Sequence, residues 1–153
     1  FDIIAIMAFF PKVSFFGRAY LTKIPVFGSV LKMIDFVPMK STDLRNTRSM
    51  MDQLEEKAAK GSVAIFPEGT RTRTGELNRF RKGFIRLARA TGYPVLPITL
   101  EGFFSFKPAN RFCINFTTPL GVTIHPPIRS ADLDGLNDHE FTEEVKGVIA
   151  SSY

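Results

Sequence analysis

The sequence predicts an α/β fold in which a mainly parallel central sheet is flanked by helices on both faces within a single domain. Short apolar or β-prone runs alternate with longer segments of helical periodicity, an order typical of parallel strands joined by crossover helices. The runs 62–66 and 95–100 are continuously apolar, as in strands that are covered on both sides. A length of 153 residues fits one domain and can bury a substantial core.

The clearest predicted helix covers residues 42–60. Leu44, Met51 and Leu54 fall on one face at helical spacings, and Gly61 supplies a stop signal. Four other segments have the length or punctuation of helices. Helices are therefore expected over residues 3–10, 24–34, 42–60, 81–91 and 138–151.

The strands are expected to deliver loops to one edge of the sheet. In open parallel sheets, ligands bind beyond the carboxyl ends of the strands. The loop that follows Phe66 leaves such an end, which makes it the first place to look for a site. Strands are expected over residues 13–16, 36–39, 62–66, 95–100, 111–116 and 122–125.

Composition narrows the class of protein. Apolar residues make up 44% and charged residues 23%, as in a folded chain. The net charge of +5 favours an anionic partner, whether nucleic acid, a phosphorylated metabolite or an acidic membrane, without choosing among them. A single cysteine, Cys113, excludes an internal disulfide framework and is expected to be a buried thiol.

The distribution of hydrophobic residues bears on whether the chain spans or contacts a membrane. No run reaches the roughly 20 apolar residues that span a bilayer, and residues 3–10 are too few. The segment has no basic region before it, so it does not read as a signal peptide, and a start at Phe1 suggests a chain cut from a longer one. The 16 Phe residues suit either a core or a lipid-facing rim; for Phe103, Phe104 and Phe106, buried packing is the more frequent outcome.

The segment 66–71, Phe-Pro-Glu-Gly-Thr-Arg, concentrates groups that can bind a phosphate-bearing acceptor. Arg71 offers a planar fork for phosphate oxygens, and Glu68 can accept a hydrogen bond from a hydroxyl. The competing interpretation is a plain turn in which Glu68 and Arg71 form a local salt bridge. A Walker-type loop is excluded because no glycine-rich run ends in Gly-Lys-Ser or Gly-Lys-Thr.

The segment 66–71, followed by Gly75 and by Phe-Arg-Lys-Gly at 80–83, resembles the glycerophospholipid acyltransferase family, in particular its lysophosphatidic acid acyltransferases. Two further stretches, 93–98 and 23–28, are similar to other family motifs. The resemblance extends from residue 1 to about residue 128.

The resemblance implies an O-acyltransferase. It would move a fatty acyl group from acyl-CoA or acyl-carrier protein to the free hydroxyl of 1-acylglycerol 3-phosphate, giving phosphatidic acid for phospholipid biosynthesis. The donor would be a substrate, with no cofactor, metal or nucleic acid involved, and the protein would be membrane-associated on the cytoplasmic face. The alternatives are another lysophospholipid or lyso-ornithine lipid as acceptor, or a non-catalytic module that binds anionic lipid.

Family members carry a histidine, four intervening residues and an aspartate, and by resemblance Asp2 is this aspartate. Residues 1–153 would then form an acyltransferase domain truncated at its N-terminus within that motif, and inactive as given. Asp2 would orient the imidazole of a histidine four places before Phe1, and it is also placed to cap the helix that it begins. His125 and His139 lack the motif and are expected to be structural or solvated.

Within the acceptor loop, the resemblance assigns Arg71 to the phosphate and Glu68 to a glycerol hydroxyl. Backbone N–H groups of Gly69 and Thr70 would add to the anion site.

Three further basic positions carry less specific assignments. Arg81 and Lys82 match the basic residues of the family's Phe-Lys-Lys-Gly-like element and would bind acceptor or coenzyme A phosphates; otherwise they are solvated helix-start residues. The family's second block usually ends with an arginine, where this chain has Ser41. Lys40, displaced by one residue, or Arg45 is expected to take its place.

Overall fold

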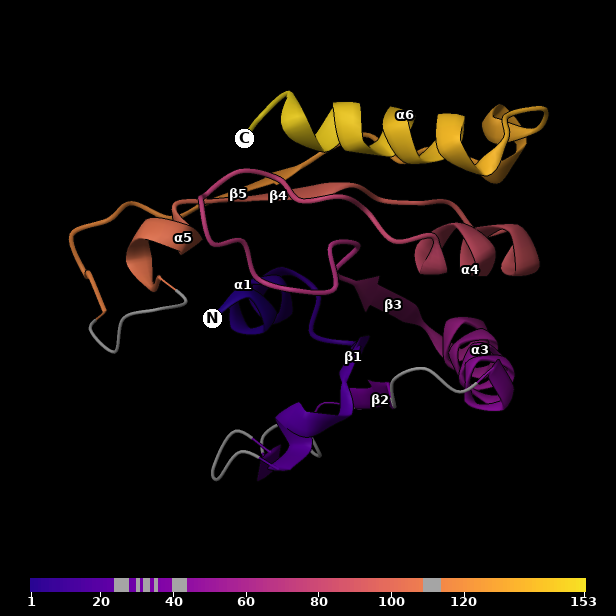
Figure 1. Cartoon of the computed structure of the whole chain (residues 1–153), viewed down its shortest axis with the longest axis horizontal. Helices are drawn as coiled ribbons and strands as arrows, with labels where there is room; N and C mark the ends of the chain where they lie inside the picture. Colours follow the sequence, from indigo (N-terminus) through magenta and orange to yellow (C-terminus); the bar gives the residue numbers. More distant parts are fainter. Residues whose placement is uncertain (24–27, 30, 32–33, 35, 40–43, 109–113) are drawn as a thin grey trace.

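The computed structural model describes residues 1–23, 28–29, 31, 34, 36–39, 44–108 and 114–153. Its centre is a parallel sheet of strand order β2-β1-β3, and a separate antiparallel pair is formed by β4 and β5 (Figure 1). The strands are β1 (Val13–Arg18), β2 (Phe36–Met39), β3 (Ser62–Ile65), β4 (Ile98–Glu101) and β5 (Gly121–Ile124).

The parallel sheet is covered on both faces, as the sequence predicts. Alternation along β1 sends Phe15 and Phe16 to opposite sides. Phe15 packs in a cluster with Ile6 of α1 (Asp2–Phe9), whereas Phe16 packs with Leu54 of α3 (Leu44–Lys60) and Leu87 of α4 (Gly83–Thr91). The α/β prediction is therefore confirmed for the sheet that supports the loop after β3.

The helices agree with the periodicity of the sequence, with ends displaced by a few residues. The predicted helix 24–34 lies largely outside the described residues, and α3 is described from Leu44 onward. Gly92 ends α4 in the left-handed conformation, at φ 67°, which is the stop predicted for it. The α-helices include α1 (Asp2–Phe9), α3 (Leu44–Lys60), α4 (Gly83–Thr91), α5 (Phe103–Phe106) and α6 (Asp138–Ala150), and short 3₁₀ turns cover Ala19–Lys23 and Ser130–Leu133.

The predicted capping role of Asp2 is wrong. Phe1 is the N-cap of α1 and no side chain caps it; Asp2 is the first helical residue. Its carboxylate still lies in the first turn, where the helix dipole favours negative charge.

The second half of the chain departs from a purely parallel arrangement, because β4 and β5 pair antiparallel. The strand predicted over 111–116 is not found at residues 114–116, while 111–113 lie outside the described residues. Asn115 explains the difference: its Oδ1 accepts hydrogen bonds from the backbone N–H and the hydroxyl of Thr117. This local bonding favours a turn over a strand.

A buried polar chain joins α6 to the antiparallel pair, and α6 runs alongside these strands in Figure 1. The Thr99 hydroxyl donates to the Ile149 carbonyl at 2.8 Å and lies 2.8 Å from Nε2 of His125. Because the hydroxyl has only one hydrogen, Nε2 of His125 must be the donor to it. His125 thus has the structural role that was one of its two expected roles, and His139 is exposed.

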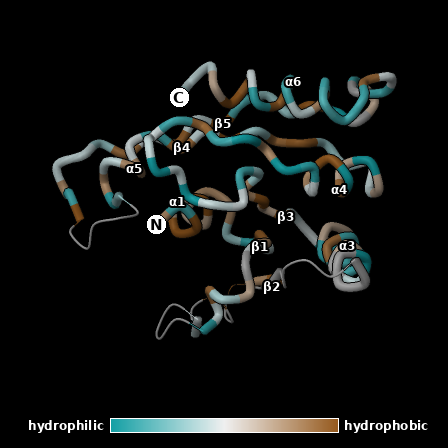
Figure 2. Tube along the Cα trace, viewed as in Figure 1, coloured by the Kyte–Doolittle hydropathy of each residue, from teal (hydrophilic) through white to brown (hydrophobic). Residues whose placement is uncertain are grey.

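Helix α1 is apolar around most of its circumference (Figure 2). Ile6 is buried, whereas Phe1, Ile4 and Phe9 are about half exposed. In the part of the chain that the structure describes, no helix is both long enough and apolar enough to cross a bilayer.

Candidate functional site

The candidate site is the loop that leaves the carboxyl end of β3. The first residue of this loop, Phe66, packs in the core beside α1. The Gly69 N–H donates to the Phe66 carbonyl at 3.0 Å and closes a tight turn. Farther on, the Arg81 N–H donates to the Pro67 carbonyl at 2.8 Å, which ties the two ends of the loop together. Residues ten or more apart in sequence are thereby brought to one place.

Glu68 is fixed in orientation by Asn78. Its Oε2 accepts from both the backbone N–H and the side-chain amide of Asn78, each at 2.8 Å. None of the described residues forms an ion pair with Glu68, so the predicted alternative of a Glu68–Arg71 salt bridge is not observed. The Glu68 carboxylate is therefore oriented by Asn78 and does not neutralise Arg71.

Arg81 lies directly over Gly69. A Cβ added at Gly69 would stand 2.8 Å from Nε of Arg81, and Gly69 has a φ of 63°, which favours glycine. The absence of a side chain at Gly69 therefore lets a guanidinium approach the turn that carries Glu68. Thr70, the next residue, is exposed at the surface of this turn.

Arg71 extends to the other side of the loop. Its Nη2 donates to the backbone carbonyl of Lys107, directly after α5. A guanidinium has five N–H donors, so this bond orients the group and leaves donors for an anion. Arg71 is exposed, as a ligand-binding group would be.

The start of α1, where Asp2 lies, contacts α5 next to the acceptor loop. The Phe1 ring meets the Phe106 ring edge-on at 5.0 Å between centroids, and Phe106 directly precedes the Lys107 that accepts from Arg71. The start of α1 and the acceptor loop therefore contact one short segment. Phe106 is buried, while Phe103 and Phe104 are partly buried, so packing prevails in this aromatic cluster.

Lys82 is placed differently from Arg81. Its Nζ lies 3.8 Å from a carboxylate oxygen of Asp138 in α6, and Arg89 shares this carboxylate at 3.5 Å. Lys82 thus bridges α4 and α6, and the structure does not bring it to Glu68. Lys40 lies outside the described residues, and so does the side chain of Arg45.

Two residues of the site were not predicted. Asn78 could have been predicted as an amide side chain within the loop. Tyr153 could not, because it lies 78 residues from its partner Gly75 in the sequence. The Tyr153 hydroxyl donates to the Gly75 carbonyl at 2.6 Å. Burial, and then the negative charge of Glu68, raise the pKa of Tyr153 above its ordinary value of 10.0.

Among the described residues, no group of three or more His, Cys, Asp or Glu side chains could hold a metal ion. The chemistry visible at the loop is that of one oriented carboxylate and two guanidinium groups. Such a set can accept from a hydroxyl and bind an anion on the same small molecule.

The family to which this fold and loop belong is identified by a sequence profile. The sequence profile described as Acyltransferase matches residues 1–101, so the chain belongs to the Acyltransferase family.

Similarity to individual proteins extends beyond the matched residues. The chain is 35% identical to a chloroplastic 1-acyl-sn-glycerol-3-phosphate acyltransferase, BAT2, from Brassica napus, over 99% of this chain and 43% of that protein. It is 34% identical to the chloroplastic LPAT1 of the same description from Arabidopsis thaliana, over 99% of this chain and 41% of that protein. The chain thus spans less than half the length of these relatives.

A solved structure shares the fold. The crystal structure of the 1-acyl-sn-glycerophosphate acyltransferase PlsC from Thermotoga maritima superposes with a TM-score of 0.70 and 25% sequence identity. The match covers 92% of this chain and 55% of that one.

Proposed function

We propose that the protein to which this chain belongs transfers a fatty acyl group from a thioester donor to the free hydroxyl of 1-acylglycerol 3-phosphate. The product would be phosphatidic acid. The observation that carries the proposal is the arrangement at the loop: Glu68 is oriented by Asn78, Arg81 lies over Gly69, and Arg71 is oriented by the Lys107 carbonyl. The names of the relatives agree with this acceptor.

Glu68 is suited to orient the glycerol part of the acceptor. Both bonds from Asn78 go to Oε2, and none of the described residues donates to Oε1. Oε1 therefore has lone pairs for an acceptor hydroxyl, while Arg71 and Arg81 supply positive charge for the phosphate. Fixing both ends of the acceptor would direct its remaining hydroxyl toward the donor.

The proposed reaction needs a general base. A histidine four places before Phe1, as the family motif implies, would take the proton from the acceptor hydroxyl. The alkoxide oxygen then bonds to the thioester carbonyl carbon, the carbon–sulfur bond breaks, and the imidazolium returns its proton to the leaving thiolate. Asp2 would orient that imidazole and stabilise its charged form.

The donor, acyl-CoA or acyl-carrier protein, is proposed to be a substrate, with no cofactor in the reaction. Lysophosphatidate partitions into membranes, so we also propose that the protein works at the cytoplasmic face of a membrane. The half-exposed Phe1, Ile4 and Phe9 on α1 would contribute apolar contact at that surface.

The test is acyl transfer by the full-length protein, with acyl-CoA as donor and 1-acylglycerol 3-phosphate as acceptor. Arg71→Ala should lower kcat/KM by about a hundredfold, because a charged hydrogen bond to phosphate is lost. Arg86→Ala removes an exposed arginine of α4 away from the loop and serves as the matched control.

Other outcomes separate the alternatives. Equal turnover with monoacylglycerol, which has no phosphate, or full activity of Arg71→Ala would contradict the acceptor assignment. Preference for lyso-ornithine lipid or another lysophospholipid would replace the acceptor but keep the reaction. No transfer to any acceptor, together with retained binding to anionic lipid, would favour the non-catalytic module.

A further inference from the structure

The short helix α5 contacts both parts of the proposed reaction site. Its Phe106 ring meets the ring of Phe1, at the start of α1, edge-on with 5.0 Å between the centroids. Arg71 of the acceptor loop donates to the backbone carbonyl of Lys107, the residue after α5. Figure 1 shows α5 on the same side of the molecule as the N-terminus. A helix of four residues therefore connects the start of α1, which carries Asp2, to Arg71.

Both ends of α5 are fixed by the segment that precedes β5. At its start, Gly102 approaches Pro119 so closely that a Cβ at Gly102 would stand 2.1 Å from the Pro119 carbonyl oxygen. At its end, the Phe106 carbonyl accepts a hydrogen bond from the Asn115 N–H at 2.8 Å. A single helical turn is not stable by itself, so these contacts hold α5 in place. The helix is therefore a fixed support for the two parts that it touches.

The Phe106 side chain sets a direction as well as a distance. It is buried, and the planes of the Phe106 and Phe1 rings are 86° apart. The edge-on arrangement is favourable because the positive edge of one ring meets the negative face of the other. A leucine at position 106 would fill much of the same space, but it would not orient the Phe1 ring.

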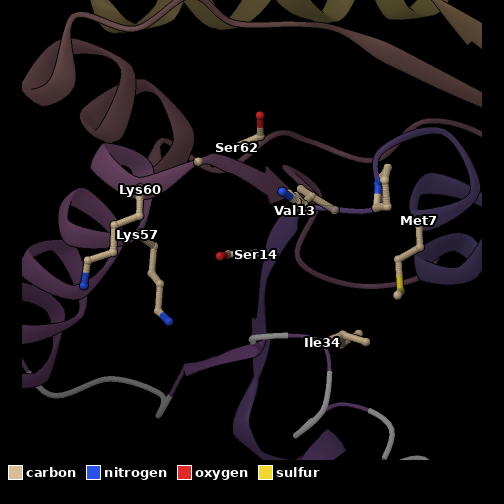
Figure 3. A pocket seen from close by; sticks show the side chains of 10 residues that line it. Met7, Val13, Ser14, Ile34, Lys57, Lys60 and Ser62 are labelled. Carbon is tan, nitrogen blue, oxygen red and sulfur yellow. The ribbon is translucent and has the colours of Figure 1, made fainter.

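Other packing fixes α1 less completely. Ile6 is buried in a cluster with Phe15 of β1. Elsewhere on the helix, Met7, and beyond its end Pro11, line a cavity of about 280 Å³ at the amino ends of β1 and β3 (Figure 3). Side chains beside a cavity are packed less closely than those in a core. The contact at Phe1 is therefore important for where the start of α1 lies.

The separation between the start of α1 and the acceptor loop matters for acyl transfer. In the proposed function, Arg71 binds the acceptor phosphate, and the histidine that Asp2 orients takes the proton from the acceptor hydroxyl. The hydroxyl reaches this base only if the two parts have the right separation. A displacement of about 1 Å is enough to lower the rate by about a hundredfold.

We infer that Phe106 is a positioning residue that keeps the start of α1 in register with Arg71. The inference rests on the proposed function, because it concerns one acceptor held between two parts of that site. Phe106 acts through the Phe1 ring and through the Lys107 carbonyl that follows it, and not by contact with the acceptor, because its side chain is buried.

The test is a double-mutant cycle in the full-length protein, with acyl-CoA as donor and 1-acylglycerol 3-phosphate as acceptor. Phe106→Leu should lower kcat by about tenfold and change the acceptor KM little, because the hydroxyl is misplaced while Arg71 is retained. The double variant Phe106→Leu/Arg71→Ala should lose about a hundredfold in kcat/KM, as Arg71→Ala alone does, because the two residues act together. Losses that multiply to about a thousandfold would show independent roles and overturn the inference.

Two further variants keep the test decisive if Phe106→Leu folds poorly, which urea unfolding reports. Phe1→Leu removes the partner ring at a half-exposed position and should lower kcat to the same extent. The matched control is Phe116→Leu, which removes another edge-on ring from Phe106 at a side chain that is 82% exposed and outside α1; its kcat should be unchanged.

The outcomes separate this inference from the function on which it rests. Unchanged kcat in Phe1→Leu and in a folded Phe106→Leu, or an equal loss in Phe116→Leu, would overturn the positioning role alone. Full activity of Arg71→Ala would instead contradict the acceptor assignment, and the positioning role with it.

Discussion

At the scale of single residues, the site depends on how closely side chains approach the turn at Gly69. The sequence shows a glycine between Glu68 and Thr70, and a glycine in a turn is unremarkable by itself. The structure adds that Arg81 occupies the space next to its Cα. The glycine therefore serves two needs, a positive φ and room for a guanidinium.

Gly69→Ala separates these two needs. The alanine should cost about 1 kcal/mol in the free energy of unfolding, because the left-handed conformation disfavours a Cβ. It should also displace Arg81 and raise the KM for the lysophosphatidate acceptor in full-length protein. Gly92→Ala is the matched control: its φ is 67°, and a Cβ there would meet nothing within 4 Å.

Urea unfolding and steady-state kinetics measure the two effects. Similar losses of stability in both variants, with a raised acceptor KM only in Gly69→Ala, are expected. An unchanged KM in Gly69→Ala would mean that Arg81 does not contact the acceptor.

At the scale of elements, the loop between β3 and α4 is fixed by parts of the chain that follow it. Arg71 bonds to the carbonyl after α5, a Cβ at Gly75 would stand 3.2 Å from the Phe104 ring, and Tyr153 bonds to the Gly75 carbonyl. The family profile ends at residue 101. These three contacts therefore come from residues beyond the segment that the family profile matches.

Tyr153→Phe tests this support. Loss of the bond to Gly75 should speed amide hydrogen exchange in the loop and raise the acceptor KM several-fold, with less effect on kcat. Tyr20→Phe, at another exposed tyrosine, is the control. Unchanged exchange at residues 72–77 would show that Tyr153 does not restrain the loop.

The pH dependence of this contact has a defined sign. The pKa of Tyr153 is raised by burial and by Glu68, so the folded state favours the neutral phenol. The stabilisation is complete below the unfolded value of 10.0 and is lost only as the pH rises through the higher folded pKa. The bond to Gly75 should therefore persist throughout the neutral range.

At the scale of the whole molecule, the two sheets are connected by helices that pack on one another and on the strands. Helix α4 packs on α3 above the parallel sheet through Leu87, and on α6 through Phe84 and Phe141, whose rings meet edge-on at 6.0 Å between centroids. The Thr99, His125 and Ile149 chain then attaches α6 to the antiparallel pair. These contacts fix the C-terminal segment that ends in Tyr153.

Thr99→Val should destabilise the fold by about 2 kcal/mol, because it leaves the buried Nε2 of His125 without its partner and removes one of the donors to the Ile149 carbonyl. Thr99→Ser keeps the hydroxyl and should cost less. Urea unfolding of both variants gives the comparison. Equal stability of the valine variant and the parent chain would show that the polar chain contributes nothing.

Local patterns alone were enough to predict the elements near the site. The strand at 36–39 and the α3 helix follow from residue types within one or two turns, as does the Gly92 stop, because these depend on short-range periodicity and on backbone conformation. The motif at 66–71 likewise predicts the loop and its candidate residues from adjacent positions in the sequence.

Pairing over long distances decided the rest. Asp2 remains a predicted catalytic residue, although its capping role was wrong, since Phe1 occupies the N-cap. Lys82 forms an ion pair with Asp138 of α6, a contact that the residues near Lys82 in the sequence do not predict. The antiparallel pairing of β4 with β5 depends on strands 20 residues apart, whose direction is set by the chain between them.

The loop after β3 shows most clearly which features the sequence determines and which depend on the tertiary structure. By itself, the sequence determined that residues 66–71 form a polar turn with a carboxylate and a guanidinium at the end of a buried strand, because these properties are local. Only the tertiary structure decided that Glu68 bonds to Asn78 rather than to Arg71, and that Tyr153 closes on Gly75. The physical reason is that a charged side chain chooses its partner by the geometry of the folded chain, which residue spacing does not specify.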